Sequence, residues 1–204
     1  MNWIYGNRYL SENEMKNNAL IITDYLLERE WSYNAIAGML GNMEAESTIN
    51  PGIWQNLNNS NTSGGFGLVQ WTPSTNYTQW ALENGYAIDD GYGQLKWIDE
   101  ETDNAGQWIM TDGYMFTFYL FKRSVGEPEY LASAFLKNFE RAGVEVEEQR
   151  RANARKWYEY ITGNYDPVTP DPEDPENPST PSTTKKRQKF NFILFDRRRR
   201  FKTL

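Results

Sequence analysis

The chain has 204 residues, which gives room for one ordinary domain and an appendage. It contains no cysteine and no histidine, which excludes disulfides, thiolate or imidazole metal sites, and Ser-His-Asp or Cys nucleophilic catalysis. Acid–base chemistry near neutral pH must therefore fall to a carboxyl group with a raised pKa, or less often to Tyr or Lys. We expect neither a metal nor another cofactor.

The N-terminal segment, MNWIYGNRYLSENEMKNN, lacks the basic start and the continuous apolar stretch of a signal peptide. No segment approaches the roughly 18 consecutive apolar residues that a membrane span needs. The sequence therefore predicts neither a signal peptide nor a membrane span.

Helical periodicity predicts a first long helix over residues 14–31, and Ser32 is the expected N-cap of a second. The apolar stripe of this second helix consists of Ile36, Met39, Leu40 and Met43. Asn50-Pro51-Gly52 is expected to stop it. Further helical segments are predicted near 74–84, 91–105, 113–123, 127–141 and 145–161. Strand signals are few and short, so the predicted class is mainly α.

Charge and composition divide the chain into three parts. Residues 1–164 carry 12 basic and 22 acidic side chains and form the predicted folded domain. Residues 165–184 are rich in Pro, Asp and Glu and are typical of an extended linker. Residues 185–204 form a short basic and aromatic tail, which is too short for a core of its own and is predicted to be a docking peptide or disordered.

Two carboxylates, Glu44 and Glu46, lie near the end of the second predicted helix. At about 100° per residue they lie on either side of its apolar stripe, so helix geometry does not show which of the two is the functional carboxylate. A glutamate at such an edge is most often a solvated helix-face residue.

The local sequence around Glu46 is more informative than helix geometry. ESTINP (46–51) is followed some fifteen residues later by GFGLVQWTP (65–73), which resembles the lysozyme-like superfamily of soluble lytic transglycosylases and goose-type lysozymes. In closer detail, GMLGNMEAESTINPGIWQNL and GGFGLVQWTP resemble the phage tail lysozyme family, over most of residues 30–160. The resemblance implies a lysozyme-like fold, α+β with very little strand, and the activity of a wall hydrolase at a phage tail tip.

Carried onto this chain, the family pattern makes Glu46 the catalytic acid and Ser47 a supporting hydrogen-bonding residue. The substrate-binding wall would comprise Gly67, Leu68, Gln70 and Trp71, with Trp71 as the expected sugar-stacking aromatic residue. A glycosidic oxygen leaves readily only when it is protonated, so the acid needs a raised pKa. A helix C-terminus beside Ile49, Phe66 and Trp71 is expected to raise the pKa of Glu46.

A second carboxylate is less well defined by the sequence. Most glycosidases use two, although transglycosylase-like and goose-type relatives often manage with one. The candidates are Asp99, Glu100, Glu101, Asp103, Asp112 and Glu140, and their spacing favours none of them. We expect Glu140 and Arg141 to form a structural ion pair. Because NFERAG (138–143) departs from the Tyr-Asn-Ala-Gly motif of transglycosylases, it favours hydrolysis, and transglycosylation stays open.

The sequence thus predicts a muramidase-type glycoside hydrolase that cleaves the β-1,4 bond between N-acetylmuramic acid and N-acetylglucosamine in peptidoglycan. The expected location is the phage virion, with other tail proteins contacting the C-terminal segment. The alternatives are a catalytically silent glycan-binding tail module and an endolysin for host lysis. We expect no nucleic-acid partner, because the acidic main domain would repel phosphate.

Overall fold

The computed structural model describes residues 1–141 and 146–164. The α-helices are α1 (Glu12–Leu27), α2 (Tyr33–Ser47), α3 (Thr75–Glu83), α4 (Gly91–Lys96), α5 (Phe118–Arg123), α6 (Pro128–Phe135) and α7 (Glu147–Asn164). Two π-helical turns, η2 (Trp97–Glu101) and η3 (Leu136–Glu140), continue α4 and α6, and the 3-10 turn η1 (Gln55–Leu57) follows α2. The predicted linker and basic tail lie outside the described residues.

The predicted mainly helical class with very little strand is confirmed. Within residues 1–141 and 146–164, β pairing is limited to isolated bridges that join Trp54 to Phe66, Phe66 to Trp71 and Thr111 to Tyr114. None of the helices described is both long enough and apolar enough to cross a bilayer.

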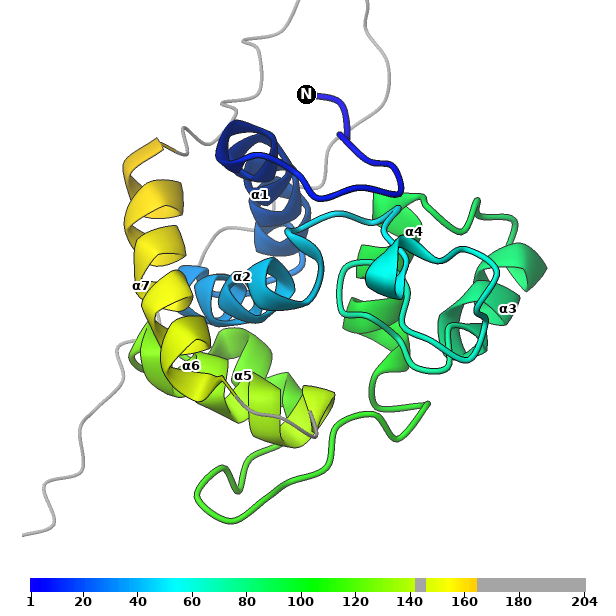
Figure 1. The fold of residues 1–204 in the computed structure, drawn as a ribbon. Coiled ribbons are helices and arrows are strands. Elements are labelled where there is room, and N and C mark those ends of the chain that lie inside the picture. The colour runs from blue at the N-terminus through cyan, green and yellow to red at the C-terminus, as the bar shows by residue number, and fades with distance from the viewer. Residues whose placement is uncertain (142–145, 165–204) are drawn as a thin grey trace, which may run out of the picture. The chain divides into compact units, whose positions relative to one another are not determined.

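Helix α2 lies at the centre of the helical packing, against α7 and α6, and it also contacts α1 and α5 (Figure 1). Its residues from Ala35 to Met43 are all buried. Buried residues therefore lie on every side of the helix and not only on the single stripe that the sequence predicts, because four other helices pack against it.

Glycines allow two neighbouring helices to approach α2 closely. A Cβ atom on Gly38 would lie 2.9 Å from the backbone carbonyl carbon of Leu131 in α6. A Cβ atom on Gly41 would lie 2.5 Å from the carbonyl oxygen of Arg150 and 2.8 Å from the nitrogen of Ala154, both in α7. These separations are too short for any side chain, so the missing Cβ atoms set the distance between the helices.

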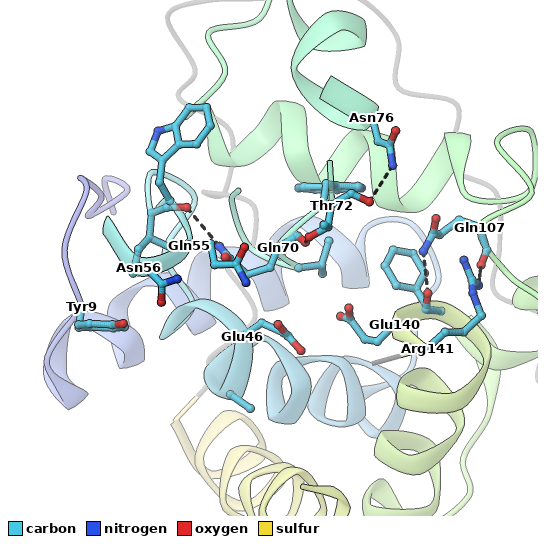
Figure 2. Close-up of a pocket in the computed structure, with 16 residues that line it drawn as sticks. Tyr9, Glu46, Gln55, Asn56, Gln70, Thr72, Asn76, Gln107, Glu140 and Arg141 are labelled. Carbon is cyan, nitrogen blue, oxygen red and sulfur yellow. Dashed lines mark hydrogen bonds between the residues drawn. The ribbon is translucent and has the colours of Figure 1, made fainter. Parts of the chain in front are cut away.

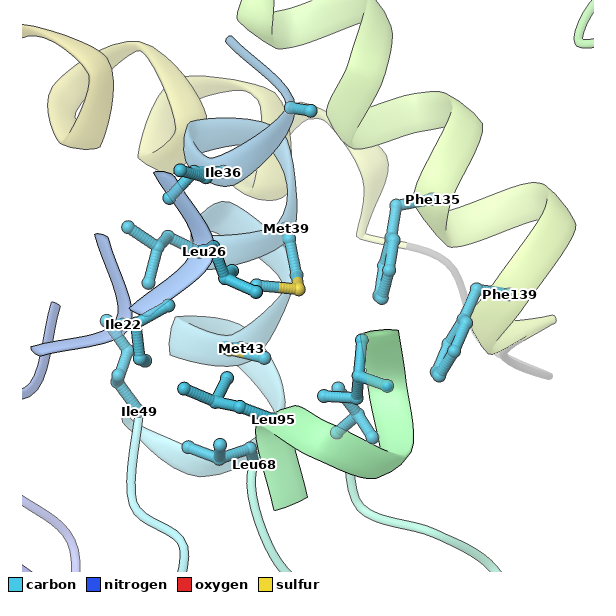
Figure 3. Packing of buried hydrophobic residues seen from close by; sticks show 14 of the residues in the cluster. Ile22, Leu26, Ile36, Met39, Met43, Ile49, Leu68, Leu95, Phe135 and Phe139 are labelled. Carbon is cyan, nitrogen blue, oxygen red and sulfur yellow. The ribbon is translucent and has the colours of Figure 1, made fainter. Parts of the chain in front are cut away.

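The hydrophobic core joins the central helix to the loop that follows it. Figure 3 shows side chains of α1, α2, α4, α6 and η3 converging with Ile49 and Leu68 from the loop region. Leu68 is fully buried in this cluster. Burial of a leucine side chain contributes about 1.5–3 kcal/mol, so Leu68 anchors the 65–73 segment against α2.

Local sequence determines where α2 starts and ends. Ser32 is its N-cap, as predicted, and the Ser32 side chain accepts a hydrogen bond of 3.0 Å from the backbone N–H of Ala35. The helix ends at Ser47, earlier than the predicted stop at 50–52, because Thr48 and Ile49 take the left-handed conformation with φ of 52° and 54°. This early end leaves Glu46 in the last turn of the helix.

Two other predicted helices are shorter in the structure. The segment predicted over 91–105 is helical only through Glu101. The segment predicted over 113–123 begins at Phe118, because Thr111 and Tyr114 form a tight turn and Thr117 caps α5 by accepting from the N–H of Leu120.

Candidate active site

A cavity of about 680 Å³ opens where the end of α2 meets the 53–56 loop, the 69–72 loop and η3. Figure 2 shows the side chains that line it. They are Tyr9, Ala45, Glu46, Ile53, Trp54, Gln55, Asn56, Val69, Gln70, Trp71, Thr72, Asn76, Gln107, Phe139, Glu140 and Arg141. The lining thus combines apolar side chains with several side-chain amides and two carboxyl groups.

The structure distinguishes the two carboxylates at the end of α2. Glu46 lines the cavity, and its side chain is 19% exposed. Glu44 is not among the cavity residues, and its carboxylate accepts hydrogen bonds from Nζ of Lys156 at 2.6 Å and from Nε1 of Trp157 at 2.7 Å. Glu46 is therefore the carboxylate of α2 that can reach a bound ligand.

Arg150 of α7 is the ionic partner of Glu46. Its Nη2 donates to Oε1 of Glu46, and its Nη1 donates to Oδ1 of Asn42 at 3.1 Å. The Arg150 side chain is only 7% exposed, so this pair is largely shielded from water. The sequence did not indicate this contact, because it depends on how closely α7 packs against Gly41.

Glu140 is the second carboxyl group of the cavity. Figure 2 shows Glu46 and Glu140 pointing toward one another, one from the end of α2 and one from the end of η3. Oε1 of Glu140 is buried and has no hydrogen-bond partner. Burial, and next the charge of Glu46, raise the pKa of Glu140 well above the ordinary carboxyl value, although Arg150 and Arg141 act in the opposite direction.

The predicted ion pair between Glu140 and Arg141 is wrong for the described residues. The Arg141 guanidinium instead donates to backbone carbonyl groups, to that of Asn138 at 2.9 Å and to that of Gln107. Arg141 adopts a left-handed backbone conformation with φ of 49°, which turns it away from the axis of η3. It therefore fixes the backbone next to Glu140 without forming an ion pair with the carboxyl group.

Three of the residues predicted from the motif lie behind the cavity wall. The hydroxyl group of Ser47 donates to the carbonyl groups of Met43 at 2.9 Å and Leu68 at 2.8 Å. The N–H of Leu68 donates to Oε1 of Gln94 at 2.8 Å, and Gly67 takes a φ of 80° that allows the turn. Ser47, Gly67 and Leu68 thus join the 65–73 segment to α2 and are not part of the lining.

Gln70 and Trp71 do line the cavity. Nε2 of Gln70 donates to the carbonyl groups of Ile53 at 3.2 Å and Gly67 at 3.1 Å, which holds its amide in place. Trp71 is only 4% exposed, and its ring stacks on Tyr77 with the centroids 4.5 Å apart. Little of its face is left for a ligand, whereas Tyr9, which is 62% exposed, and Trp54 border the same cavity.

Several polar cavity residues have no counterpart in the sequence prediction: Gln55, Asn56, Thr72, Asn76 and Gln107. Of these, Gln107 comes from a distant loop, and its Nε2 donates to the carbonyl group of Phe139 at 2.6 Å. Only the fold brings such residues together. Gln55 and Asn56 lie within the longer motif segment GMLGNMEAESTINPGIWQNL, so the sequence did contain a signal for these two.

Comparison with known proteins gives consistent matches. A family model described as phage tail lysozyme matches residues 17–161. Over 157 residues the chain is 50% identical to Morphogenesis protein 1 of Bacillus phage B103. That alignment covers 77% of this chain and 42% of the relative, so the chain spans less than half of the relative's length.

Proposed function

Because the chain belongs to the phage tail lysozyme family, we propose that its folded part, residues 1–164, is a muramidase-type glycosidase. Its substrate would be the β-1,4 bond between N-acetylmuramic acid and N-acetylglucosamine in peptidoglycan. The observation that carries this proposal is the pair of carboxyl groups, Glu46 and Glu140, facing one another in a cavity large enough for sugar rings.

The lining of the cavity suits a neutral, hydroxylated ligand. Side-chain amides offer both donors and acceptors to hydroxyl and acetamido groups, and they come from Gln55, Asn56, Gln70, Asn76 and Gln107. The two exposed or half-buried aromatic residues at its border, Tyr9 and Trp54, offer faces on which a sugar ring can stack. Trp71, buried against Tyr77, would support the wall more than bind the sugar face.

We place Glu46 in this reaction as a catalytic carboxyl group. Ser47, Gly67 and Leu68 would act indirectly, by holding the 65–73 segment against the helix that carries Glu46. Gln70 would bind an acetamido or hydroxyl group with the carbonyl oxygen of its anchored amide.

The biological setting is also a proposal. The relative from Bacillus phage B103 bears the name Morphogenesis protein 1, which fits a protein of the phage particle. We therefore propose a location at the virion tail and a role in opening the host wall during entry. Segment 185–204 would contact neighbouring tail proteins.

The first prediction is that Glu46→Gln abolishes clearing of bacterial wall suspensions while the variant stays folded. Glu44→Gln is the matched control, because Glu44 lies on the same helix but outside the cavity. We expect a loss of at least about 100-fold for Glu46→Gln and nearly full activity for Glu44→Gln. Turbidity and thermal melting of both purified variants are the measurements.

Two results would contradict the proposed function. Unchanged clearing by Glu46→Gln would remove this residue from the chemistry. A wild type that pellets with walls but never clears them would instead be a silent glycan-binding module. Mass spectrometry of the released fragments should show reducing ends, as hydrolysis requires, and anhydro ends would show transglycosylation.

A further inference from the structure

We infer that Arg141 is a specificity-determining residue of the proposed glycosidase, and that its guanidinium binds a carboxylate carried by the N-acetylmuramic acid units of peptidoglycan. This inference rests on the proposed function and adds the feature by which the cavity would distinguish peptidoglycan from a neutral polymer of N-acetylglucosamine. Each N-acetylmuramic acid unit carries a lactyl group. The carboxyl group of that lactyl group is either free or joined to a stem peptide, which has carboxylates of its own.

Arg141 supplies the positive charge of the cavity lining. Among the lining residues in the described part of the chain, it is the only one with a cationic side chain. Arg150, the other cation of this region, is mostly buried, pairs with Glu46 and is not a lining residue. An anionic group that enters the cavity therefore has one guanidinium to bind.

The guanidinium of Arg141 keeps donors for a ligand. Its Nη1 donates to the backbone carbonyl groups of Asn138, at 2.9 Å, and of Gln107, and both acceptors are uncharged. Within residues 1–141 and 146–164, the edge formed by Nε and Nη2 has no hydrogen-bond partner, and Arg141 itself is exposed. Such an edge presents two parallel N–H groups, the arrangement that fits the two oxygens of a carboxylate.

The position of Arg141 suits a substituent of a sugar bound at the two carboxyl groups. In the view of Figure 2, Glu46 and Glu140 lie between Tyr9 on one side and Arg141 on the other. A glycan strand that presents a glycosidic bond to the two carboxyl groups would therefore bring the substituents of an adjoining ring to Arg141. The bonds to Gln107 and Asn138 hold the guanidinium at this end of the cavity.

The backbone at Arg141 supports a role beyond ending the helix. Its φ of 49° lies in the left-handed region, where the residue after a helix is usually Gly or Asn. The N–H of Arg141 donates to the carbonyl group of Leu136 at 2.8 Å, a bond that ends the helix without any side chain. The arginine is thus held in a conformation that glycine would adopt without strain, and such residues cluster at binding sites.

The test measures how three soluble tetrasaccharides bind the full chain in a Glu46→Gln background, in which no cleavage is expected. One is a peptidoglycan fragment with its stem peptides, and the second is the same fragment after an amidase has left free lactyl carboxylates. The third is the neutral tetra-N-acetylchitotetraose. Isothermal titration calorimetry compares Arg141→Gln with Arg151→Gln, a matched control that removes an exposed arginine outside the cavity.

We expect Arg141→Gln to weaken binding of a carboxylate-bearing fragment by about 10-fold or more, and that of chitotetraose by less than about 2-fold. Arg151→Gln should change none of the three affinities. A loss confined to the fragment with peptides identifies a stem-peptide carboxylate as the ligand. A loss confined to the peptide-free fragment identifies the lactyl carboxylate.

Two results would overturn the inference. Equal losses for all three ligands would show that Arg141 only supports the backbone at the end of η3. Unchanged affinities would show that the guanidinium binds no part of the glycan. Neither result bears on the proposed function, which is judged separately by whether Glu46→Gln still clears walls.

A crystal structure covers the case in which Arg141→Gln does not fold. In Glu46→Gln crystals soaked with each peptidoglycan fragment, we expect a ligand carboxylate oxygen within about 3.2 Å of the Arg141 guanidinium in at least one complex. A bound glycan whose carboxylates all point away from Arg141 would refute its role without any substitution at this position.

Discussion

On the scale of single residues, Arg150 is the ion-pair partner of Glu46 at the edge of the cavity. Its guanidinium is the only described cation that bonds Glu46, and it also bonds Asn42 on the neighbouring turn of α2. Removal of Arg150 should therefore lower the stability of the protein, because Glu46 loses its mostly buried counter-ion.

We predict that Arg150→Met lowers the free energy of unfolding by about 3 kcal/mol, because a mostly buried carboxylate loses its counter-ion. Urea denaturation is the measurement. Arg151→Met is the control, because Arg151 is exposed and, among the described residues, bonds only Ser133 at 3.3 Å. Equal effects of the two substitutions would show that Arg150 has no special role.

The two motif segments of the sequence meet at one cavity in the structure. Glu46, Gln70 and Trp71 are brought together at one cavity, and all three lie in the two motif segments. Arg150 and the orientation of Glu140 were not predictable, because they depend on contacts between helices far apart in the chain. The predicted pair of Glu140 with its neighbour Arg141 failed since the left-handed turn at Arg141 sends its side chain toward backbone carbonyls.

On the scale of elements, the contact between α2 and α7 determines the geometry of the site. Gly41 allows the α7 backbone to approach so closely that a Cβ atom would lie 2.5 Å from the carbonyl oxygen of Arg150. The helix that carries Glu46 and the helix that carries Arg150 can therefore pack this closely only because Gly41 has no side chain.

We predict that Gly41→Ala lowers the free energy of unfolding by about 1–3 kcal/mol and reduces wall clearing, because α7 must shift and carry Arg150 with it. Gly163→Ala is the matched control in α7, since nothing lies within 4 Å of a Cβ atom there. It should be neutral or stabilise the helix by up to about 1 kcal/mol. A Gly41→Ala protein as stable and active as the wild type would show that the helices tolerate a wider separation.

The elements themselves were largely predictable. Periodic apolar residues located α1, α2, α6 and α7, and Ser32 marked the start of α2. The sequence could not show that α2 is enclosed on all sides, because its small residues, such as Gly38 and Gly41, interrupt the apolar pattern at the closest helix contacts. The boundaries of α5 depended on a local turn at 111–114 that periodicity does not detect.

On the scale of the whole molecule, the buried carboxyl group of Glu140 links folding to pH. Its pKa is raised in the folded protein, so the folded state holds this proton more tightly than the unfolded chain does. The contribution to stability is fully present below the ordinary carboxyl pKa and is lost as the pH rises through the raised value.

We predict that the melting temperature of Glu140→Gln rises relative to that of the wild type as the pH increases from about 5 to about 9. The reason is that the glutamine amide never ionises. Titrating groups that both proteins share cancel in the difference between their melting curves. Parallel dependence on pH would mean that Glu140 is ionised in both the folded and the unfolded state across this range.

The Glu46–Arg150 pair has a consequence for how the protein is made. The two residues lie 104 positions apart, and their helices, α2 and α7, pack against each other around Gly41. A nascent chain that has emerged through α6 therefore contains Glu46 but not Arg150, its ion-pair partner. The cavity described above is therefore complete only once α7 has been synthesised and has packed against α2.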